Sequence, residues 1–168
     1  AHQCAVCQDT CHITENRKAL KKYDKAMKAW RDGDRARSLD LLFDAVAIDD
    51  QYVDAWWRIA TFYFNMNRIR KAEEYLYTVV ELCPDYNVYA YYYLAQIEYG
   101  REDYSAAIKY LDIFLEDVGK IKGEKDYDDA VYMYDQAKFL GRIYSNKVPF
   151  HPRRVDSIST DDDEYLAI

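Results

Sequence analysis

The chain of 168 residues contains only 5 glycines and 3 prolines. An all-β protein needs many turn-forming residues, so this scarcity favours a helical protein with short connections. No apolar run approaches the roughly 18 to 20 residues that a helix needs to cross a bilayer, so we expect no direct membrane span. The first four residues, 1–4, are too polar for a secretory signal. We therefore expect either a cytoplasmic protein or one whose signal has been removed.

Basic residues are also in deficit. The chain has 23 Lys and Arg against 30 Asp and Glu, which gives a net charge of −7. Because binding to a phosphate backbone needs a basic surface, we expect no nucleic-acid partner. Histidines are few as well, namely His2, His12 and His151, and they stand outside the region of helical periodicity. No Ser/His/Asp set, phosphate-binding glycine loop or carboxylate pair in an apolar context is visible, so we predict no enzyme.

Tyrosine, in contrast, is abundant, with 18 residues in a chain that is half apolar and one third charged. Its ring is apolar and its hydroxyl is polar, which suits a surface that must be both hydrated and adhesive. The same properties suit a residue that fills gaps between long amphipathic helices. Both interpretations stay open from composition alone.

Apolar residues recur every three or four positions along most of the chain, as at Leu20, Tyr23 and Met27. This spacing places them on one face of a helix. Thr14 precedes the first such segment and is expected to be its N-cap. We predict helices over residues 15–31, 35–48, 53–64, 69–82, 89–99, 104–118 and 126–146.

Similar residues recur at an interval of 35 positions. The pairs are Ala60 and Ala95, Ala72 and Ala107, Leu76 and Leu111, and Val79 and Phe114. Small and large apolar residues in a fixed order at this period indicate a repeated helical hairpin. Such hairpins stack because each alone cannot bury its apolar face, and the stack usually presents a surface to a partner.

The second repeat resembles a tetratricopeptide repeat. The match consists of Trp56-x2-Ile59-Ala60-x2-Tyr63, followed by Ala72, Leu76, Val79 and Pro84. The next repeat departs from the pattern at Glu98, where an aromatic residue is expected. The resemblance implies an all-α, right-handed superhelix of antiparallel helix pairs, about seven helices in all. Its expected parts are a Cys/His-rich leader (1–13), a repeat domain (14–147) with repeats at about 19–52, 53–87 and 88–121 and a capping half-repeat at 126–147, and a linker (148–168).

The same resemblance implies a concave groove lined by the first helix of each pair. The expected groove residues are Tyr23, Met27, Trp30, Trp57, Thr61, Phe64, Tyr92, Gln96 and Tyr99, with Lys138 and Arg142 at a basic end. The groove is expected to hold an extended or helical peptide of a protein partner. Alternatively, some of these rings pack against neighbouring helices. Chaperone-binding members of the family hold a carboxylate with a Lys/Asn clamp, but Tyr23, Met27, Trp57 and Thr61 stand at the clamp positions here.

The tail offers a second resemblance. Ile158-Ser159-Thr160, followed by Asp163-Glu164-Tyr165-Leu166, is similar to the entry of the β-propeller in bacteroidete outer-membrane-associated proteins, although Ala167 replaces their usual proline. In that family a tetratricopeptide region precedes a propeller and an OmpA-like peptidoglycan-binding domain, and some members belong to type IX secretion machinery. This implies a non-catalytic scaffold in a periplasmic, outer-membrane-associated assembly, with downstream domains as further partners. The alternative is a cytosolic adaptor or co-chaperone.

The leader carries Cys4, Cys7, Cys11 and His12, in the spacing C-x2-C-x3-C-H. Three thiols and an imidazole suit zinc, but a second ligand pair at the usual distance is missing. A haem attachment site needs C-x-x-C-H, which this spacing does not match. We predict no cofactor and favour disulfide or free thiols in the leader. Cys83 precedes Pro84 at a helix end, where we expect a small buried residue, with a disulfide to one leader cysteine as the alternative. A metal- or haem-binding redox protein is the remaining alternative.

Overall fold

The computed structural model describes residues 14–118 and 125–145. The predicted leader and linker lie outside these residues. The described helices are α1 (Arg17–Arg31), α2 (Arg35–Ile48), α3 (Val53–Asn65), α4 (Ile69–Leu82), α5 (Tyr89–Gly100), α6 (Tyr104–Val118) and α7 (Lys125–Ser145). No strand occurs among the described residues, and none of their helices is long and apolar enough to cross a membrane.

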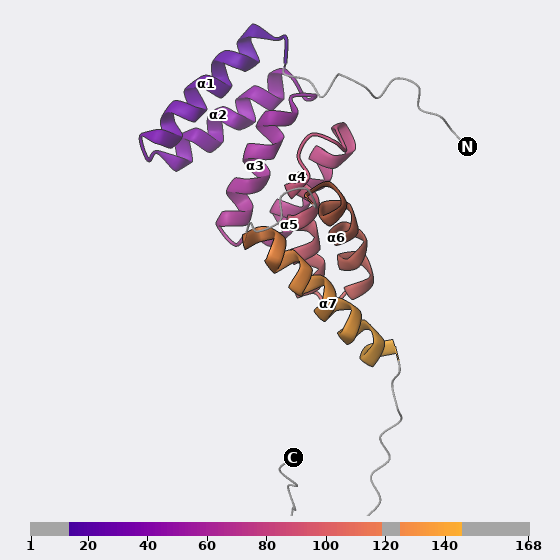
Figure 1. The fold of residues 1–168 in the computed structure, drawn as a ribbon. Helices are drawn as coiled ribbons and strands as arrows, with labels where there is room; N and C mark the ends of the chain where they lie inside the picture. The colour runs from indigo at the N-terminus through magenta and orange to yellow at the C-terminus, as the bar shows by residue number, and fades with distance from the viewer. Residues whose placement is uncertain (1–13, 119–124, 146–168) are drawn as a thin grey trace, which may run out of the picture.

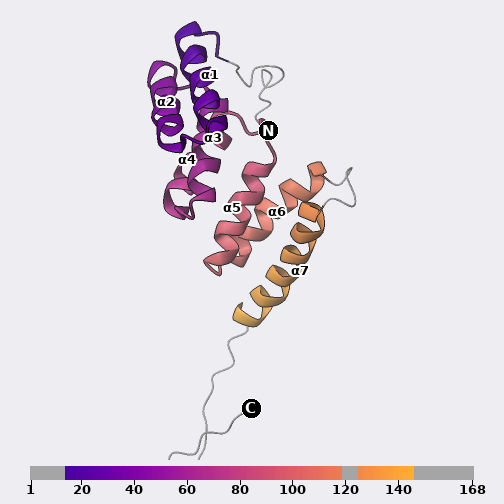
Figure 2. The ribbon, with the colours of Figure 1, turned by 90° about the vertical axis from the view of Figure 1, so that its left-hand side faces the viewer.

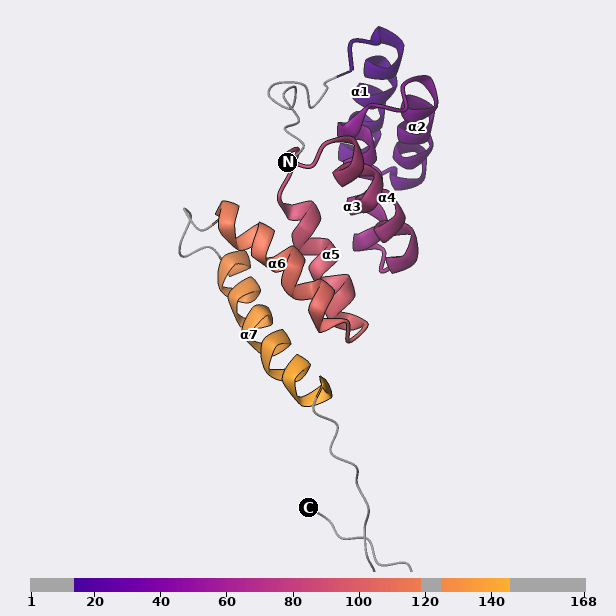
Figure 3. The same cartoon turned by 90° about the vertical axis from the view of Figure 1, so that its right-hand side faces the viewer.

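Successive helices pack as hairpins, α1 with α2, α3 with α4, and α5 with α6. The hairpins follow one another from α1–α2 at one end of the molecule to α7 at the other (Figure 1). Two further views show α7 alongside α6 at the end of the stack (Figures 2 and 3). The predicted all-α superhelix of helix pairs is therefore confirmed.

The first helix begins later than expected. Asn16, not Thr14, is the N-cap of α1, because its side chain accepts hydrogen bonds from the backbone N–H groups of Lys18 and Ala19. The prediction for Thr14 was wrong because this side chain has another role. Its hydroxyl accepts from the Asn16 N–H and donates to the carboxylate of Asp49, tying the start of α1 to the end of α2.

The core consists of small and large residues in alternation between the helices. The repeated alanines, such as Ala60, Ala72, Ala95 and Ala107, are fully buried. Alanine lets two helix backbones approach closely, and the adjacent leucines fill the space toward the next hairpin. The large residues Leu42, Leu76, Leu94 and Leu111 are almost completely buried. The period seen in the sequence is thus a packing period.

Glu98 departs from the family pattern, and the structure shows what it contacts. It is nearly buried, and its carboxylate accepts a hydrogen bond from Arg101 at 3.5 Å. The same guanidinium forms a two-pronged ion pair with Glu73 on α4. The charge of Glu98 is therefore matched, and the ion pairs join α4 to α5.

Candidate partner-binding groove

A cavity lies between α1 and α3 and is closed on one side by α5. Its volume is about 290 Å³. The residues that line this α1–α3 cavity are Met27, Trp30, Leu42, Trp57, Arg58, Thr61, Phe62, Asn65 and Tyr93. Four predicted groove residues, Met27, Trp30, Trp57 and Thr61, thus come together. The helices that carry them, α1 and α3, are the first helices of their hairpins.

Stacked rings form the wall of this cavity. The ring of Trp57 stacks on that of Tyr93 with centroids 5.8 Å apart. Tyr93 also stacks on Phe64, with centroids 4.4 Å apart. On α1, Trp30 meets Phe62 edge-on at 5.7 Å and remains 37% exposed. Sequence reasoning missed Tyr93. The available signal was the run of three tyrosines, Tyr91 to Tyr93, because consecutive residues point in different directions around a helix and one of them can reach α3.

One positive charge is fixed in the wall. The Nε of Arg58 donates a hydrogen bond to the hydroxyl of Tyr23 at 3.3 Å, and this bond raises the pKa of the guanidinium. Tyr23 itself packs against Tyr52 at 5.2 Å between centroids and does not line the cavity. Its role is to position Arg58. Thr61, which also lines the cavity, donates its hydroxyl to the Arg58 carbonyl within α3 at 3.1 Å.

A second cavity, of about 500 Å³, lies between α5 and α7. This α5–α7 cavity is lined by Tyr92, Gln96, Tyr99, Asp129, Tyr132 and Met133. The three predicted groove residues of α5 are therefore adjacent. Tyr92, however, is only 6% exposed and stacks on Phe114 of α6 at 4.7 Å. Burial, with the carboxylates of Asp129 and Asp126, raises the pKa of its hydroxyl. Tyr92 contributes more to the core than to the groove surface.

The remaining predicted residues are not part of these two cavities. Phe64 supports Tyr93 and lines a neighbouring cavity together with Gln96. Lys138 and Arg142 are exposed, and the ammonium of Lys138 lies 4.0 Å from the centroid of the Tyr134 ring. At about 100° per residue, Lys138 and Arg142 lie about 140° and 180° around α7 from Met133. The structure thus does not bring this basic pair together with the aromatic set.

Sequence reasoning missed the α7 residues of the α5–α7 cavity. Ala130 and Ala137 are fully buried and mark the packed face of α7. Asp129 and Met133 lie on one flank of that face, beside α5, and Lys138 lies on the other. The small residues spaced seven apart were the available signal for this orientation.

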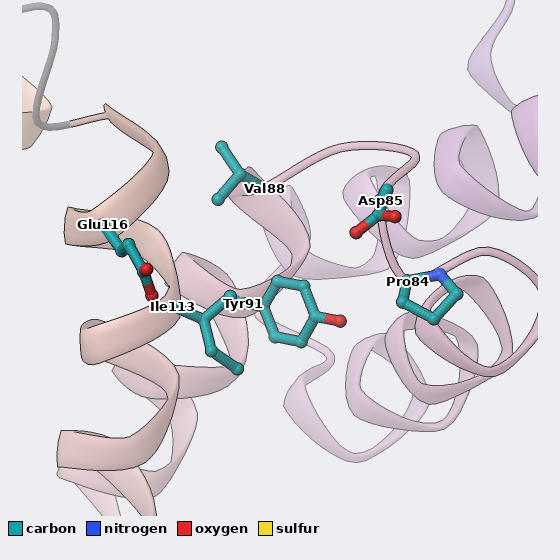
Figure 4. A pocket seen from close by; sticks show the side chains of 6 residues that line it. All are labelled: Pro84, Asp85, Val88, Tyr91, Ile113 and Glu116. Carbon is teal, nitrogen blue, oxygen red and sulfur yellow. The ribbon is translucent and has the colours of Figure 1, made fainter. Parts of the chain in front are cut away.

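Another cavity, of about 390 Å³, lies where the α4–α5 loop meets α6. Figure 4 shows the side chains that line it: Pro84, Asp85, Val88, Tyr91, Ile113 and Glu116. Burial, with the carboxylate of Asp85, raises the pKa of the Tyr91 hydroxyl. None of the predicted groove residues lines this cavity.

The cysteine predictions fall mainly outside the described residues, where Cys4, Cys7, Cys11 and His12 all lie. Cys83, at the end of α4, is 6% exposed and disulfide-bonded. Which cysteine pairs with it stays a prediction. Within residues 14–118 and 125–145, no three metal-ligating side chains gather into a site.

Comparison with known proteins places this architecture in a class. A model of the tetratricopeptide repeat family matches residues 54–86. Among curated proteins, the Sol locus transcriptional repressor of Clostridium acetobutylicum is 34% identical over 84 residues. That match covers 49% of this chain and 26% of the repressor, so the chain spans about a quarter of its relative.

Several solved structures have a fold similar to that of this chain. The first TPR of Spaghetti (RPAP3) bound to HSP90 peptide SRMEEVD has a TM-score of 0.57 at 16% identity, over 79% of this chain and 98% of that one. The Sgt2 TPR domain from Aspergillus fumigatus has a TM-score of 0.58 at 16% identity, over 86% and 93%. A MamA double mutant has a TM-score of 0.63 at 15% identity, over 77% and 68%. The chain therefore has the tetratricopeptide repeat fold.

Proposed function

We propose that the chain binds a peptide segment of a partner protein in the α1–α3 cavity. The observation that carries this proposal is the meeting of Trp30, Trp57 and Tyr93 around one cavity with Arg58 in its wall. An apolar side chain of the peptide fills the space between the rings. A carboxylate or carbonyl of the peptide accepts from the guanidinium.

The physical support is preorganisation. Trp57 is held by its stacking on Tyr93, and Arg58 is held by Tyr23, before any peptide arrives. Little side-chain freedom is therefore lost on binding, which improves affinity for a given contact area. Partly exposed aromatic residues and arginine are also the residue types that carry most of the binding energy at protein interfaces.

The test is a pair of matched substitutions. Random peptides displayed on phage are selected on the wild-type chain, and a selected peptide is labelled and titrated. Thr61→Arg fills the α1–α3 cavity and is expected to weaken binding at least about tenfold. Thr78→Arg on α4 is the control, because it adds the same charge outside the cavity. Like Thr61, Thr78 donates its hydroxyl to a carbonyl of its own helix, that of Glu74, so both substitutions remove the same kind of hydrogen bond. Equal affinity of the two variants would contradict the proposal.

We further propose a periplasmic, outer-membrane-associated setting, in which the downstream propeller and OmpA-like domains belong to the same assembly. The disulfide of Cys83 supports it, because structural disulfides persist in oxidising compartments and are rare in the cytosol. The propeller-like motif at 158–166 also supports it, although it lies outside the described residues. Reading the complete gene tests this setting: the absence of a propeller coding region would contradict it.

A cytosolic co-chaperone-like adaptor is the second candidate. It is favoured by the likeness in fold to the TPR of Spaghetti bound to HSP90 peptide SRMEEVD. Met27, Trp57 and Thr61 supply no clamp for a terminal carboxylate, so we expect this peptide not to bind. Titration with SRMEEVD separates the candidates, since saturable binding would favour the adaptor. Metal analysis of the purified chain addresses the third alternative, a redox protein using the leader.

A further inference from the structure

The outer face of α7 carries an apolar seam at the end of the stack. Tyr132 is 68% exposed, Phe139 is 59% exposed and Ile143 is 52% exposed. They lie opposite the buried Ala130 and Ala137, so they point away from α6. With the partly buried Gln136 they follow the spacing 4-3-4, which is the spacing of positions a and d in a coiled coil. We call Tyr132, Gln136, Phe139 and Ile143 the outer seam.

Charge is distributed unevenly along the same helix. Its first half carries four aspartates, Asp126, Asp128, Asp129 and Asp135, against the single Lys125, and its second half carries only the basic residues Lys138 and Arg142. Two α7 helices side by side in parallel would place like charges together. Two antiparallel helices would place each acidic half beside a basic half. This complementarity selects a second copy of the chain as the occupant of the outer seam.

We propose that the chain forms a twofold-symmetric dimer through antiparallel pairing of its α7 helices. The seam fixes the register. Gln136 faces Phe139 of the second copy, and Ile143 faces Tyr132 of the second copy. Each contact occurs twice, because the same surface serves both partners. In this register Asp135 lies beside Arg142 of the second copy.

The positions of the charged residues support this register. Asp135 and Arg142 directly precede Gln136 and Ile143, so both lie on the same flank of the outer seam. Such flanking residues meet across the seam in antiparallel helix pairs. Lys138 lies farther around α7, over the ring of Tyr134. It therefore provides a control charge on the same helix.

The dimer is expected to be weak. Two helices of 21 residues meeting along one seam form an interface in the small class. We expect a dissociation constant on the order of 10 µM, with a mass approaching twice the chain mass of 19.9 kDa at higher concentration. The groove proposal is independent, since it concerns the α1–α3 cavity, which no residue of the outer seam lines.

Sedimentation equilibrium of the whole chain from about 2 to 200 µM tests the dimer. The wild type is expected to show a monomer–dimer equilibrium, and Phe139→Ser is expected to be monomeric with unchanged circular dichroism. A wild type that is monomeric at all concentrations would overturn the proposal and leave the outer seam to a different partner. So would a Phe139→Ser variant that dimerises like the wild type.

Charge exchange tests the register. Arg142→Asp and Asp135→Arg each replace two attractions by two repulsions, so each is expected to weaken the dimer about tenfold. The double variant D135R/R142D restores opposite pairs and is expected to regain the wild-type affinity. Lys138→Asp changes the charge of α7 as much as Arg142→Asp does, yet is expected to leave the affinity within about threefold. Equal losses from both, or no recovery in the double variant, would overturn the antiparallel register.

Discussion

The ring of Tyr93 stacks on the ring of Phe64 with centroids 4.4 Å apart, and it also stacks on the ring of Trp57 with centroids 5.8 Å apart. Phe64 and Trp57 both belong to α3, whereas Tyr93 belongs to α5. One tyrosine therefore joins two successive hairpins and also closes the α1–α3 cavity. A substitution of Tyr93 is therefore expected to affect both the stability of the fold and peptide binding.

Tyr93→Ala is expected to lower the free energy of unfolding by about 2–4 kcal/mol, because it removes a partly buried ring and two aromatic contacts. Tyr93→Phe keeps both stacked rings and is expected to cost less than about 1 kcal/mol. Urea unfolding followed by circular dichroism measures both. Similar losses for the two variants would show that the hydroxyl, and not the stacking, stabilises this contact.

Because the helices approach closely at the repeated alanines, we expect a larger side chain at one of these positions to destabilise the fold. Ala107 on α6 is fully buried, whereas its neighbour Ala106 is only partly buried. Ala107→Leu is expected to destabilise the fold by about 2–3 kcal/mol through overpacking. Ala106→Leu makes the same Ala-to-Leu change in the same helix, and its free energy of unfolding is expected to stay within about 0.5 kcal/mol of the wild type. If the two leucines proved equally tolerated, α5 and α6 would not meet at Ala107 as described.

The partly buried Tyr86 determines one expected response to alkaline pH. The Tyr86 hydroxyl donates to the Asp54 carboxylate at 2.5 Å, and burial, followed by this bond, raises the pKa of Tyr86 above its usual value of about 10. A raised folded-state pKa stabilises the fold fully below the unfolded pKa, and this stabilisation is lost as the pH rises from about 10 through the folded-state pKa.

Tyr86→Phe is therefore expected to cost about 1–2 kcal/mol at pH 7, where the hydrogen bond to a charged acceptor is intact. The difference between variant and wild type should shrink between pH 9 and about pH 11. Thermal unfolding of both proteins at several pH values measures it. A difference that stays constant over this range would mean that Tyr86 does not titrate differently in the two states.

The disulfide of Cys83 makes the stability sensitive to reductant. Reduction is expected to lower the free energy of unfolding by about 2–4 kcal/mol, because it restores conformational freedom to the unfolded chain. Urea unfolding with and without a phosphine reductant measures this effect. Cys83→Ser is the control, since it lacks the bond already and should not respond. Loss of stability on reduction in both proteins would assign the effect to other cysteines.

Much of the fold was predictable because the packing period is visible in the sequence. The bounds 35–48, 69–82 and 104–118 match α2, α4 and α6. These ends are marked by strong local signals, such as Gly33-Asp34 before α2 and Pro84 after α4. The start of α1 was missed because both Thr14 and Asn16 are suitable N-cap residues. Asn16 caps the helix because the Thr14 hydroxyl is bonded to Asp49, a tertiary contact that the sequence does not reveal.

The groove was less predictable, because the face that a helix presents depends on its neighbours. Met27, Trp57 and Thr61 were placed together by family analogy, and the structure brings them together. Tyr92 and Tyr93 are adjacent tyrosines, and only packing shows that Tyr92 turns to Phe114 and Tyr93 to Phe64. On α7, the buried Ala130 and Ala137 set the orientation of the helix. As a result, Asp129 and Met133 line the cavity, in place of the predicted Lys138 and Arg142.

Mapping of backbone amide shifts by nuclear magnetic resonance tests peptide binding in the groove most directly. The isotope-labelled chain is titrated with a peptide selected on the wild type. We predict that the largest shifts fall on α1 and α3 around Met27, Trp57 and Thr61, with smaller ones around Tyr93. Shifts concentrated on α2, α4 and α6 would contradict binding in the groove and place the partner on the outer surface of the stack.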